Sequence, residues 1–275
     1  MKNGFSVEDV IEPYKKGKLD GYSLSLKDAI WVKGLKSHAS SAILKNFVPL
    51  QNSTVSQKIL DNGGKIIGKT VQDAFGFGTF CVNVGNGFSV PKNPHDENRC
   101  AGGSSGGAAI AAATIDRHIA IAESTGGSII TPAAFCGVVG LCPTYGRVSR
   151  YGLISYASSL DKIGTIARNV KDAALGLEVI SGVDEKDETS ANLDILDFNL
   201  NNTLSVDGKK IGVIRYEGVD PSIQERVDEI IDFLKNRGAD IKEIKLPFTQ
   251  KYALSAYYVI AMSEASTHLA SLCGL

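Results

Sequence analysis

The first two thirds of the chain alternate between segments with strand-like and helix-like spacing of apolar side chains. Residues 22–26 alternate apolar and polar side chains, the period of a half-buried strand, and they run directly into Lys27. Residues 54–62 carry apolar side chains at helical spacing and stop at a Gly-Gly pair, after which residues 65–69 have the composition of a short strand. This alternation predicts an α/β fold with a sheet that is at least partly parallel.

A Gly-rich passage leads into the most apolar part of the chain. Residues 76–107 indicate a long ordered loop, and residues 108–114 are almost pure Ala and Ile, which predicts a closely packed helix. The pattern then predicts a strand at 118–122, a buried helix that begins within 129–135, and a strand at 137–141. Strands and helices therefore continue to alternate through the middle of the chain.

The last third repeats this alternation in a more exposed form. We predict a helix at 170–180, a linker-like connection at 184–206, strands at 210–216 and 240–246, and between these strands a helix that Asp220 caps. That helix carries one apolar stripe: Ile223, Val227, Ile230, Ile231 and Leu234. A stripe of this kind is more often core than binding surface, so we expect it to be buried.

The composition is that of a globular protein of near-neutral charge. The chain has 275 residues, 43% of them hydrophobic, which is enough to bury one sizeable core, and we expect one domain over residues 1–275. Its 29 basic and 30 acidic side chains give a net charge of −1, which argues against broad electrostatic capture of nucleic acid. Residues 1–10 contain no apolar signal region, and no stretch approaches the ~20 apolar residues of a membrane span. We therefore expect a cytoplasmic protein without membrane contact.

The cysteines form no recognisable metal or redox motif. They contain no CxxC pair, their number is odd, and most have apolar or small neighbours: Cys81, Cys100, Cys136, Cys142 and Cys273. We therefore expect buried free thiols in a reducing compartment.

One glycine motif, at residues 63–70, matches the phosphate-binding pattern GxxxxGK[ST]. A phosphate loop needs a strand before the first glycine and a helix after the lysine. Here a helix is expected before the motif, and Ile66-Ile67 inside it prefers a strand, so the context is inverted. The pattern therefore disfavours an ATPase.

A second glycine motif, at residues 103–107, matches the nucleophile-elbow pattern GxSxG at Ser105. An elbow needs a strand before the serine, whereas the preceding residues indicate a loop. Only His118 and His268 follow this serine, and we expect His118 inside a strand, so Ser–His–Asp hydrolysis is disfavoured. A flexible linker is the alternative interpretation, and the apolar helix that follows at once argues against it.

A third motif, Thr125-Gly126-Gly127-Ser128, lies between a predicted strand and an apolar segment. Its glycines allow backbone N–H groups to converge beside the Ser128 hydroxyl, and at a helix N-terminus such groups favour a developing oxyanion. Packing alone also explains small residues at a strand–helix turn, so this motif decides nothing by itself.

Four segments, in order along the chain, together resemble the amidase signature: 101–107, 124–129, 132–137 and 143–144. The resemblance runs from about Gly21 onwards and implies the amidase-signature fold, a central mixed, partly parallel β-sheet covered by helices on both faces. Within that family the chain is most similar to the A subunits of tRNA-dependent amidotransferases, which serve the synthesis of glutaminyl-tRNA or asparaginyl-tRNA. The finer match lies in residues 143–153, 158–164, 251–254 and 264–266.

The resemblance implies a Ser–Ser–Lys catalytic set. In it Ser128 is the nucleophile, Lys27 is the base, and Ser104 relays the proton between them and takes part in a cis peptide bond. A serine hydroxyl is a poor nucleophile until a base takes its proton, and a lysine is a base only where burial or nearby positive charge lowers its pKa. Lys27 ends an apolar strand, which fits that requirement.

The glycine turn and its neighbours complete the expected site. Backbone N–H groups of Thr125, Gly126 and Gly127 are expected to hold the oxyanion, an effect worth about 3–4 kcal/mol per donor. Ser105 is expected to support the turn by hydrogen bonding, and no metal is expected.

Four positions depart from the family pattern. The family usually has Asp at position 124, often Arg at 130 and commonly Lys at 142, and its amidotransferase subunits usually have Glu at 74. This chain has Ser124, Ile130, Cys142 and Ala74 at these positions. The catalytic positions are intact, so these changes concern the support of the site. Family members also usually continue well past the position of Leu275, so we expect a domain that is incomplete at its C-terminal end.

The leading hypothesis is a glutaminase subunit that supplies ammonia for the amidation of Glu-tRNA(Gln) or Asp-tRNA(Asn). It implies B and C partner subunits, glutamine or asparagine as substrate, and mischarged tRNA reached through the complex. It implies no cofactor in this subunit, because the partner subunit uses ATP and Mg. Two alternatives stay open: a stand-alone amidase that acts on another small or aryl amide, and an inactive truncated subunit.

Overall fold

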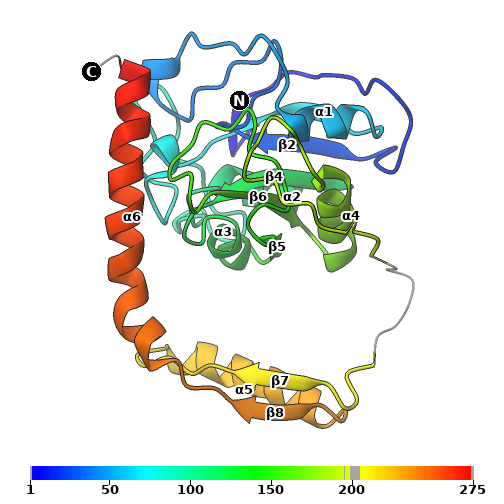
Figure 1. Ribbon diagram of the computed structural model, residues 1–275, viewed down its shortest axis with the longest axis vertical. Coiled ribbons are helices and arrows are strands. Elements are labelled where there is room, and N and C mark those ends of the chain that lie inside the picture. Colours follow the sequence, from blue (N-terminus) through cyan, green and yellow to red (C-terminus); the bar gives the residue numbers. More distant parts are fainter. Residues whose placement is uncertain (1, 195, 199–204, 274–275) are drawn as a thin grey trace. The chain divides into compact units, whose positions relative to one another are not determined.

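The computed structural model describes residues 2–194, 196–198 and 205–273, without the side chain of Cys273 (Figure 1). Its helices are α1 (Thr54–Leu60), α2 (Gly106–Thr114), α3 (Ile130–Phe135), α4 (Val170–Ile180), α5 (Pro221–Lys235) and α6 (Pro247–Cys273). Its strands are β1 (Phe5–Val7), β2 (Ser23–Lys27), β3 (Lys65–Thr70), β4 (His118–Ser124), β5 (Val139–Leu141), β6 (Lys162–Ala167), β7 (Lys210–Val213) and β8 (Asp240–Glu243). The chain divides into two compact units, Met1–Phe198 with Ala261–Leu275, and Asn199–Ile260. The interpretation of residues 1–275 as one domain stays a prediction.

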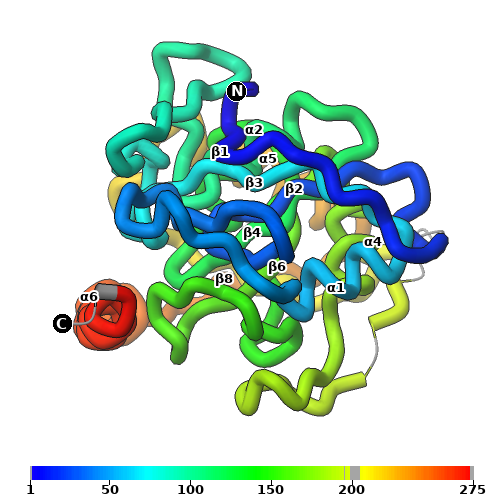
Figure 2. The backbone as a smooth tube through the Cα atoms, turned by 90° about the horizontal axis from the view of Figure 1, so that it is seen from above, coloured from blue at the N-terminus to red at the C-terminus, as the bar shows by residue number. Residues whose placement is uncertain are grey.

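The first unit is built around a six-stranded sheet with the order β1-β3-β2-β4-β6-β5. Figure 2 labels the first five of these strands. Strand β2 is parallel to both of its neighbours, β3 and β4, whereas β1, β6 and β5 each pair antiparallel with the strand beside them. The sheet is therefore mixed and partly parallel, as predicted. Because β2 and β4 are parallel, their last residues, Lys27 and Ser124, reach the same edge of the sheet.

Helices cover both faces of this sheet. Along β4, alternate side chains point to opposite faces. Ile119 and Ile121 belong to an apolar cluster with residues of α1 and α4, whereas Ala120 and Ala122 belong to a second cluster with residues of α2 and α3. The pairs α1–α4 and α2–α3 also contact each other. The predicted arrangement of helices on both faces is confirmed.

Small residues let α2 approach the sheet closely. A Cβ atom on Gly107 would lie 2.2 Å from Gly4 O and 2.7 Å from Val71 O, closer than a real side chain allows. Ala108 and the alanines after it are completely buried as far as Ala112. The glycines and alanines of this stretch thus fix the loop that enters α2, where two of the predicted site residues lie.

Several element predictions need correction. The sequence patterns predict neither β1 nor β6, because β1 has only three residues and Gly164 interrupts the apolar run of β6. The strands predicted at 210–216 and 240–246 end earlier, at Val213 and Glu243. The described residues of the predicted connection form no helix or strand, and residues 195 and 199–204 lie outside the description.

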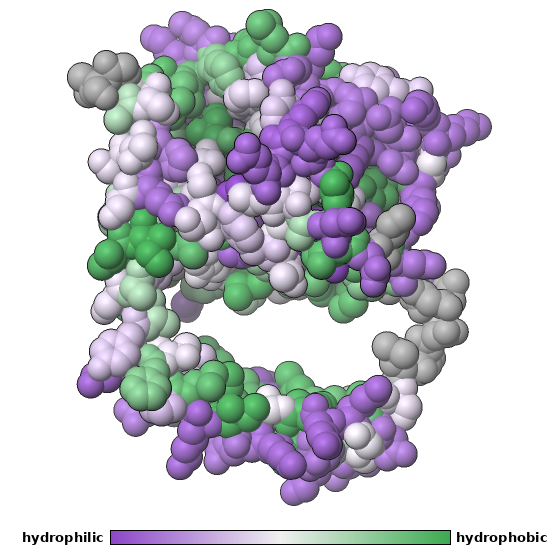
Figure 3. All heavy atoms as spheres, viewed as in Figure 1, coloured by the Kyte–Doolittle hydropathy of each residue, from purple (hydrophilic) through white to green (hydrophobic). Residues whose placement is uncertain are grey.

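The second unit contains the parallel pair β7–β8, helix α5 and the first part of α6. The apolar stripe of α5 is not buried as predicted: Ile231 and Leu234 are half-buried, and Ile223, Val227 and Ile230 are exposed. Apolar side chains of this unit are visible at its surface in Figure 3. The physical reason is that two strands present too little surface to cover the whole stripe.

The cysteine prediction is confirmed for two of the four thiols that the structure describes. Cys81 and Cys136 are buried and Cys100 and Cys142 are half-buried, all of them free, while the side chain of Cys273 lies outside the description. Burial raises the pKa of Cys81 and Cys136 to about 12, so both are protonated at neutral pH. In the described part of the chain, no helix has the length and apolar character that a membrane crossing requires.

A buried histidine makes the stability of the fold depend on pH. His118 lies 2.9 Å from both Ser23 Oγ and Ser25 Oγ, and burial lowers its pKa from 6.5 to about 3. The unfolded chain therefore binds this proton at a higher pH than the native chain does. As pH falls between these values, the free energy of unfolding falls by up to about 1.4 kcal/mol per pH unit. We expect urea unfolding of His118→Gln to show a correspondingly weaker pH dependence over this range. Equal slopes in the two proteins would argue against a buried neutral histidine.

Candidate active site

Lys27 and Ser104 meet at the edge of the sheet where β2 and β4 end. Lys27 is the last residue of β2 and is completely buried. Ser104 lies in the loop before α2, and the peptide bond between Gly103 and Ser104 is cis, the form that the family resemblance implies. Lys27 Nζ donates a hydrogen bond of 2.7 Å to Ser104 Oγ. The structure therefore brings together the predicted base and the predicted bridging serine.

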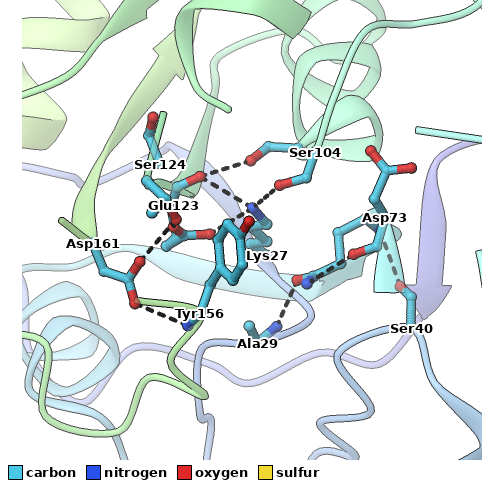
Figure 4. Close-up of polar contacts among 12 residues, drawn as sticks. Lys27, Ala29, Ser40, Asp73, Ser104, Glu123, Ser124, Tyr156 and Asp161 are labelled. Atoms are coloured by element: carbon cyan, nitrogen blue, oxygen red, sulfur yellow. Dashed lines mark hydrogen bonds and ion pairs between the residues drawn. The ribbon is translucent and has the colours of Figure 1, made fainter. Parts of the chain in front are cut away.

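Lys27 also contacts Glu123, the last residue but one of β4 (Figure 4). Its Nζ lies 3.1 Å from the Glu123 carbonyl oxygen and 2.8 Å from Glu123 Oε2. The two side chains are 0% and 4% exposed. An ammonium group has three N–H donors, and the three contacts of Nζ match them. The geometry is that of a buried ion pair with a protonated lysine, so Lys27 must lose one proton before it can act as a base.

The glycine turn follows directly after this ion pair. Ser124 Oγ accepts a hydrogen bond of 3.1 Å from the Gly127 backbone N–H, so the serine that replaces the family's usual Asp still supports the turn. Gly127 has a φ of +140°, a backbone conformation that favours glycine. Gly126 is exposed and Ser128 is half-buried, so the turn is open to solvent.

The remaining predicted residues surround this contact. Ser105 Oγ donates a hydrogen bond of 3.0 Å to the Glu123 carbonyl oxygen and so ties the loop before α2 to β4. Among the described residues, the Ser128 side chain makes no hydrogen bond. The roles of Ser128 as nucleophile and of the backbone at Thr125, Gly126 and Gly127 as oxyanion donors therefore stay predictions.

A second buried carboxyl group lies beyond Glu123. Thr125 Oγ1 lies 2.8 Å from Glu123 Oε1 and 2.8 Å from Asp161 Oδ1. Backbone N–H groups of Tyr156 and Ala157 donate to the Asp161 carboxyl group at 2.9 to 3.1 Å. Burial, followed by the negative charge of Glu123, raises the pKa of Asp161 to about 7. Within the part of the chain that the structure describes, no group of three or more His, Cys, Asp or Glu side chains is placed to hold a metal ion.

The other two glycine motifs do not form the sites that their sequence patterns are typical of. In the GxxxxGK[ST] match, Lys69 lies within β3, is completely buried and donates to Ser37 Oγ at 2.8 Å. In the GxSxG match, no strand leads into Ser105, and His118 lies in β4, hydrogen-bonded to two other serines. The structural contexts on which the sequence analysis disfavoured both motifs are confirmed.

Comparison with known proteins places the chain in a family. The model of the amidase family matches residues 7–275. The chain belongs to the amidase family. The chain is 48% identical over 260 residues to the A subunit of glutamyl-tRNA(Gln) amidotransferase from Microcystis aeruginosa, across 94% of this chain and 53% of that protein. It is 47% identical over 271 residues to the protein of the same name from Thermodesulfovibrio yellowstonii, across 98% of this chain and 55% of that protein. The chain thus spans about half the length of these curated relatives.

Solved structures agree with this placement. The crystal structure of the A subunit of glutamyl-tRNA(Gln) amidotransferase from Thermotoga maritima matches with a TM-score of 0.90 and 39% identity, covering 98% of this chain and 59% of that one. The native peptide amidase from Stenotrophomonas maltophilia matches with a TM-score of 0.80 and 31% identity, covering 93% of this chain and 54% of that one. The amidase-signature fold expected from the sequence is confirmed.

Sequence reasoning missed the acidic side chains of the candidate site. Glu123 contacts Lys27 directly and Asp161 lies behind it, while Asp73 accepts hydrogen bonds from the backbone of Cys81 and Asn83 at 2.9 and 2.8 Å. The Asp73 backbone N–H in turn donates to the Ser104 carbonyl oxygen at 3.0 Å. The sequence did contain a signal for Glu123, because it directly follows the apolar run of residues 119–122 in β4 and a buried carboxylate needs a partner. Asp73 and Asp161 lie in loops, where the sequence gives no comparable signal.

Proposed function

We propose that this chain carries the hydrolytic site of a serine amidase, with Ser128 as nucleophile, Ser104 as proton relay and Lys27 as base. The observation that carries the proposal is the buried hydrogen bond of 2.7 Å between Lys27 Nζ and Ser104 Oγ at the end of β2. When Lys27 is neutral, Ser104 can pass its proton to the amine and receive the proton of Ser128. The backbone N–H groups of Thr125 and Gly126, and that of Gly127 once it leaves Ser124 Oγ, would then stabilise the tetrahedral oxyanion.

The finer proposal is a glutaminase subunit of a tRNA-dependent amidotransferase that works in the cytoplasm. The support is the identity of 48% and 47% to the A subunits of two glutamyl-tRNA(Gln) amidotransferases. Ammonia released from glutamine or asparagine would pass to B and C partner subunits, which would use ATP and Mg to amidate mischarged Glu-tRNA(Gln) or Asp-tRNA(Asn). The near-neutral net charge of −1 agrees with tRNA binding mainly by those partners.

A second candidate function is a stand-alone amidase on another small or aryl amide. The likeness to a peptide amidase, with a TM-score of 0.80, favours it. An inactive subunit that is kept for complex assembly is the third candidate.

An ammonia-release assay separates these candidates. We expect the chain to release ammonia from glutamine in the presence of B and C subunits, and much less without them. Turnover of simple amides by the chain alone would favour the stand-alone amidase instead. Stable binding to the partner subunits without ammonia release in any setting would favour the inactive subunit.

A further inference from the structure

Two acidic side chains near Lys27 are linked to it and, through a threonine, to each other by a series of short contacts. Glu123 Oε2 accepts from Lys27 Nζ at 2.8 Å, and Glu123 Oε1 lies 2.8 Å from Thr125 Oγ1, which in turn lies 2.8 Å from Asp161 Oδ1. Glu123, Thr125 and Asp161 are all buried, with exposed fractions of 3%, 7% and 0%. Figure 4 shows the Glu123 side chain between Lys27 and Asp161. The proposed serine reaction gives neither carboxyl group a role.

The hydrogens available to these contacts favour a proton on one of the two carboxyl groups. A threonine hydroxyl has one hydrogen, so it can make a linear hydrogen bond to one carboxylate only. An ionised carboxylate has no hydrogen to donate, so two ionised groups at 2.8 Å from Thr125 Oγ1 would have to share that hydrogen in one weaker three-centre bond. If Glu123 or Asp161 is protonated, it donates to Thr125 while Thr125 donates to the other. Burial and the charge of Glu123 support this, because they raise the pKa of Asp161 to about 7.

The position of Glu123 also determines the charge that faces the base. Within the described residues, Lys27 is the only counter-ion in contact with the Glu123 carboxylate. While the shared proton is bound, the carboxyl pair carries one negative charge, which balances one ammonium group. When that proton leaves, two negative charges face the ammonium group and stabilise it further.

We propose that Glu123 positions the Lys27 amine and shares one proton with Asp161 through Thr125, so that this carboxyl pair sets the pH at which Lys27 becomes a base. The inference rests on the proposed function, because Lys27 needs to be a base only if the serines react. In that reaction Ser128 gives its proton to Ser104 while Ser104 gives its own to Lys27. Lys27 therefore begins as a neutral amine and ends as an ammonium, and Glu123 is a positioning residue.

Other ionisable groups face this cluster at longer range. Asp73 and Cys81 interact electrostatically with Lys27, and Cys142 interacts with Glu123 and with Lys162. Asp28, which follows Lys27 in the chain, interacts instead with a separate set of buried residues: His38, Ser40 and Lys69. None of these side chains hydrogen-bonds Lys27 Nζ or the Glu123 carboxylate in the described structure. Replacement of Glu123 by a neutral residue therefore removes the negative charge in direct contact with Lys27 and leaves the more distant charges in place.

The test is the pH dependence of serine labelling in Glu123→Gln. A fluorophosphonate reacts with an activated serine by forming an Oγ–P bond and releasing fluoride, while the serine proton goes to the base. We expect the rate of labelling at Ser128 to rise with pH in the unmodified chain as Lys27 is deprotonated. In Glu123→Gln the buried amine has lost its counter-ion, so we expect this midpoint to move to lower pH by roughly 1–3 units. The midpoint is read independently of the maximum rate, which a merely structural defect would lower.

Two controls keep the result interpretable. Glu12→Gln removes the acidic partner of Lys65 in an exposed pair with an N–O distance of 2.7 Å, and we expect it to leave the midpoint unchanged. Asp161→Asn keeps the Lys27–Glu123 pair but removes the shared proton site, and we expect a smaller shift in the same direction. This second variant also serves as the test if Glu123→Gln does not fold.

A readout without catalysis separates this inference from the proposed function. In protein labelled with ¹⁵N-lysine, the Lys27 signal is assigned by its loss in Lys27→Met, and its titration midpoint is then followed by NMR. We expect the midpoint to fall in Glu123→Gln relative to the unmodified chain. An unmoved or raised midpoint would overturn the inference even where Ser128 is labelled normally. Absence of labelling at every pH in the unmodified chain, with a shifted Lys27 midpoint, would instead count against the proposed function alone.

Discussion

Ammonia release from glutamine is expected to fall by roughly 10³-fold or more when Ser128 is replaced by alanine. The reason is that the proposed reaction forms its acyl intermediate on Ser128 Oγ, and alanine offers no atom that can take its place. Ser128 is half-buried and makes no hydrogen bond among the described residues, so we expect Ser128→Ala to unfold at the same temperature as the unmodified chain. The assay is run on the assembly in which the unmodified chain is active, either the chain alone or the chain with its partner subunits.

Ser222→Ala is a suitable control for this substitution. Ser222 lies at the start of α5 in the second unit, where its hydroxyl donates to Asp220 Oδ1 at 2.6 Å. The change removes the same hydroxyl group at an exposed position outside the unit that holds the candidate site, so we expect ammonia release to be retained. If Ser128→Ala kept full activity while its fold was intact, Ser128 would not be the nucleophile.

Replacement of Lys27 by methionine is expected to remove activity and to destabilise the fold as well. Lys27 and Glu123 form an ion pair of 2.8 Å with both side chains buried, and methionine leaves the Glu123 carboxylate without a counter-ion. Removal of one member of a buried pair costs about 3–5 kcal/mol. Because Glu123 can avoid this penalty only by binding a proton, we expect the loss in unfolding free energy to grow with pH.

Chemical denaturation at several pH values measures this effect, and a double variant provides the control. Lys27→Met with Glu123→Gln removes both charges and keeps the approximate volumes, so we expect it to recover most of the stability but none of the activity. If the single and double variants were equally stable, the buried ion pair would not contribute as the structure indicates.

The sequence predicted the architecture well where apolar periodicity was strong. The strand that ends at Lys27, the strand at 118–122 and the small-residue helix at 108–114 all lie in the central layers of the first unit. Strand β6 was missed because a short buried strand with a central glycine has neither alternation nor a continuous apolar run. The stripe of α5 was misjudged because periodicity shows which side of a helix is apolar, and does not show what covers it.

The candidate site was predictable only in part. The resemblance located Lys27 and Ser104, and the structure joins them by a hydrogen bond of 2.7 Å across 77 residues of sequence. The carboxyl groups behind Lys27 were not predicted, because Asp161 reaches Thr125 from a loop 36 residues away. Contacts of this kind depend on how strands β4 and β6 pair, which the sequence pattern did not predict.

Covalent labelling followed by peptide mapping tests the central claim most directly. The unmodified chain, with partner subunits where activity requires them, is treated with a fluorophosphonate, digested and examined by mass spectrometry. We predict one modified residue, Ser128, and no modification of this peptide in Lys27→Met or Ser128→Ala. Modification of Ser104 or Ser105 in place of Ser128, or equal labelling of Ser128 without Lys27, would contradict the proposed Ser–Ser–Lys reaction.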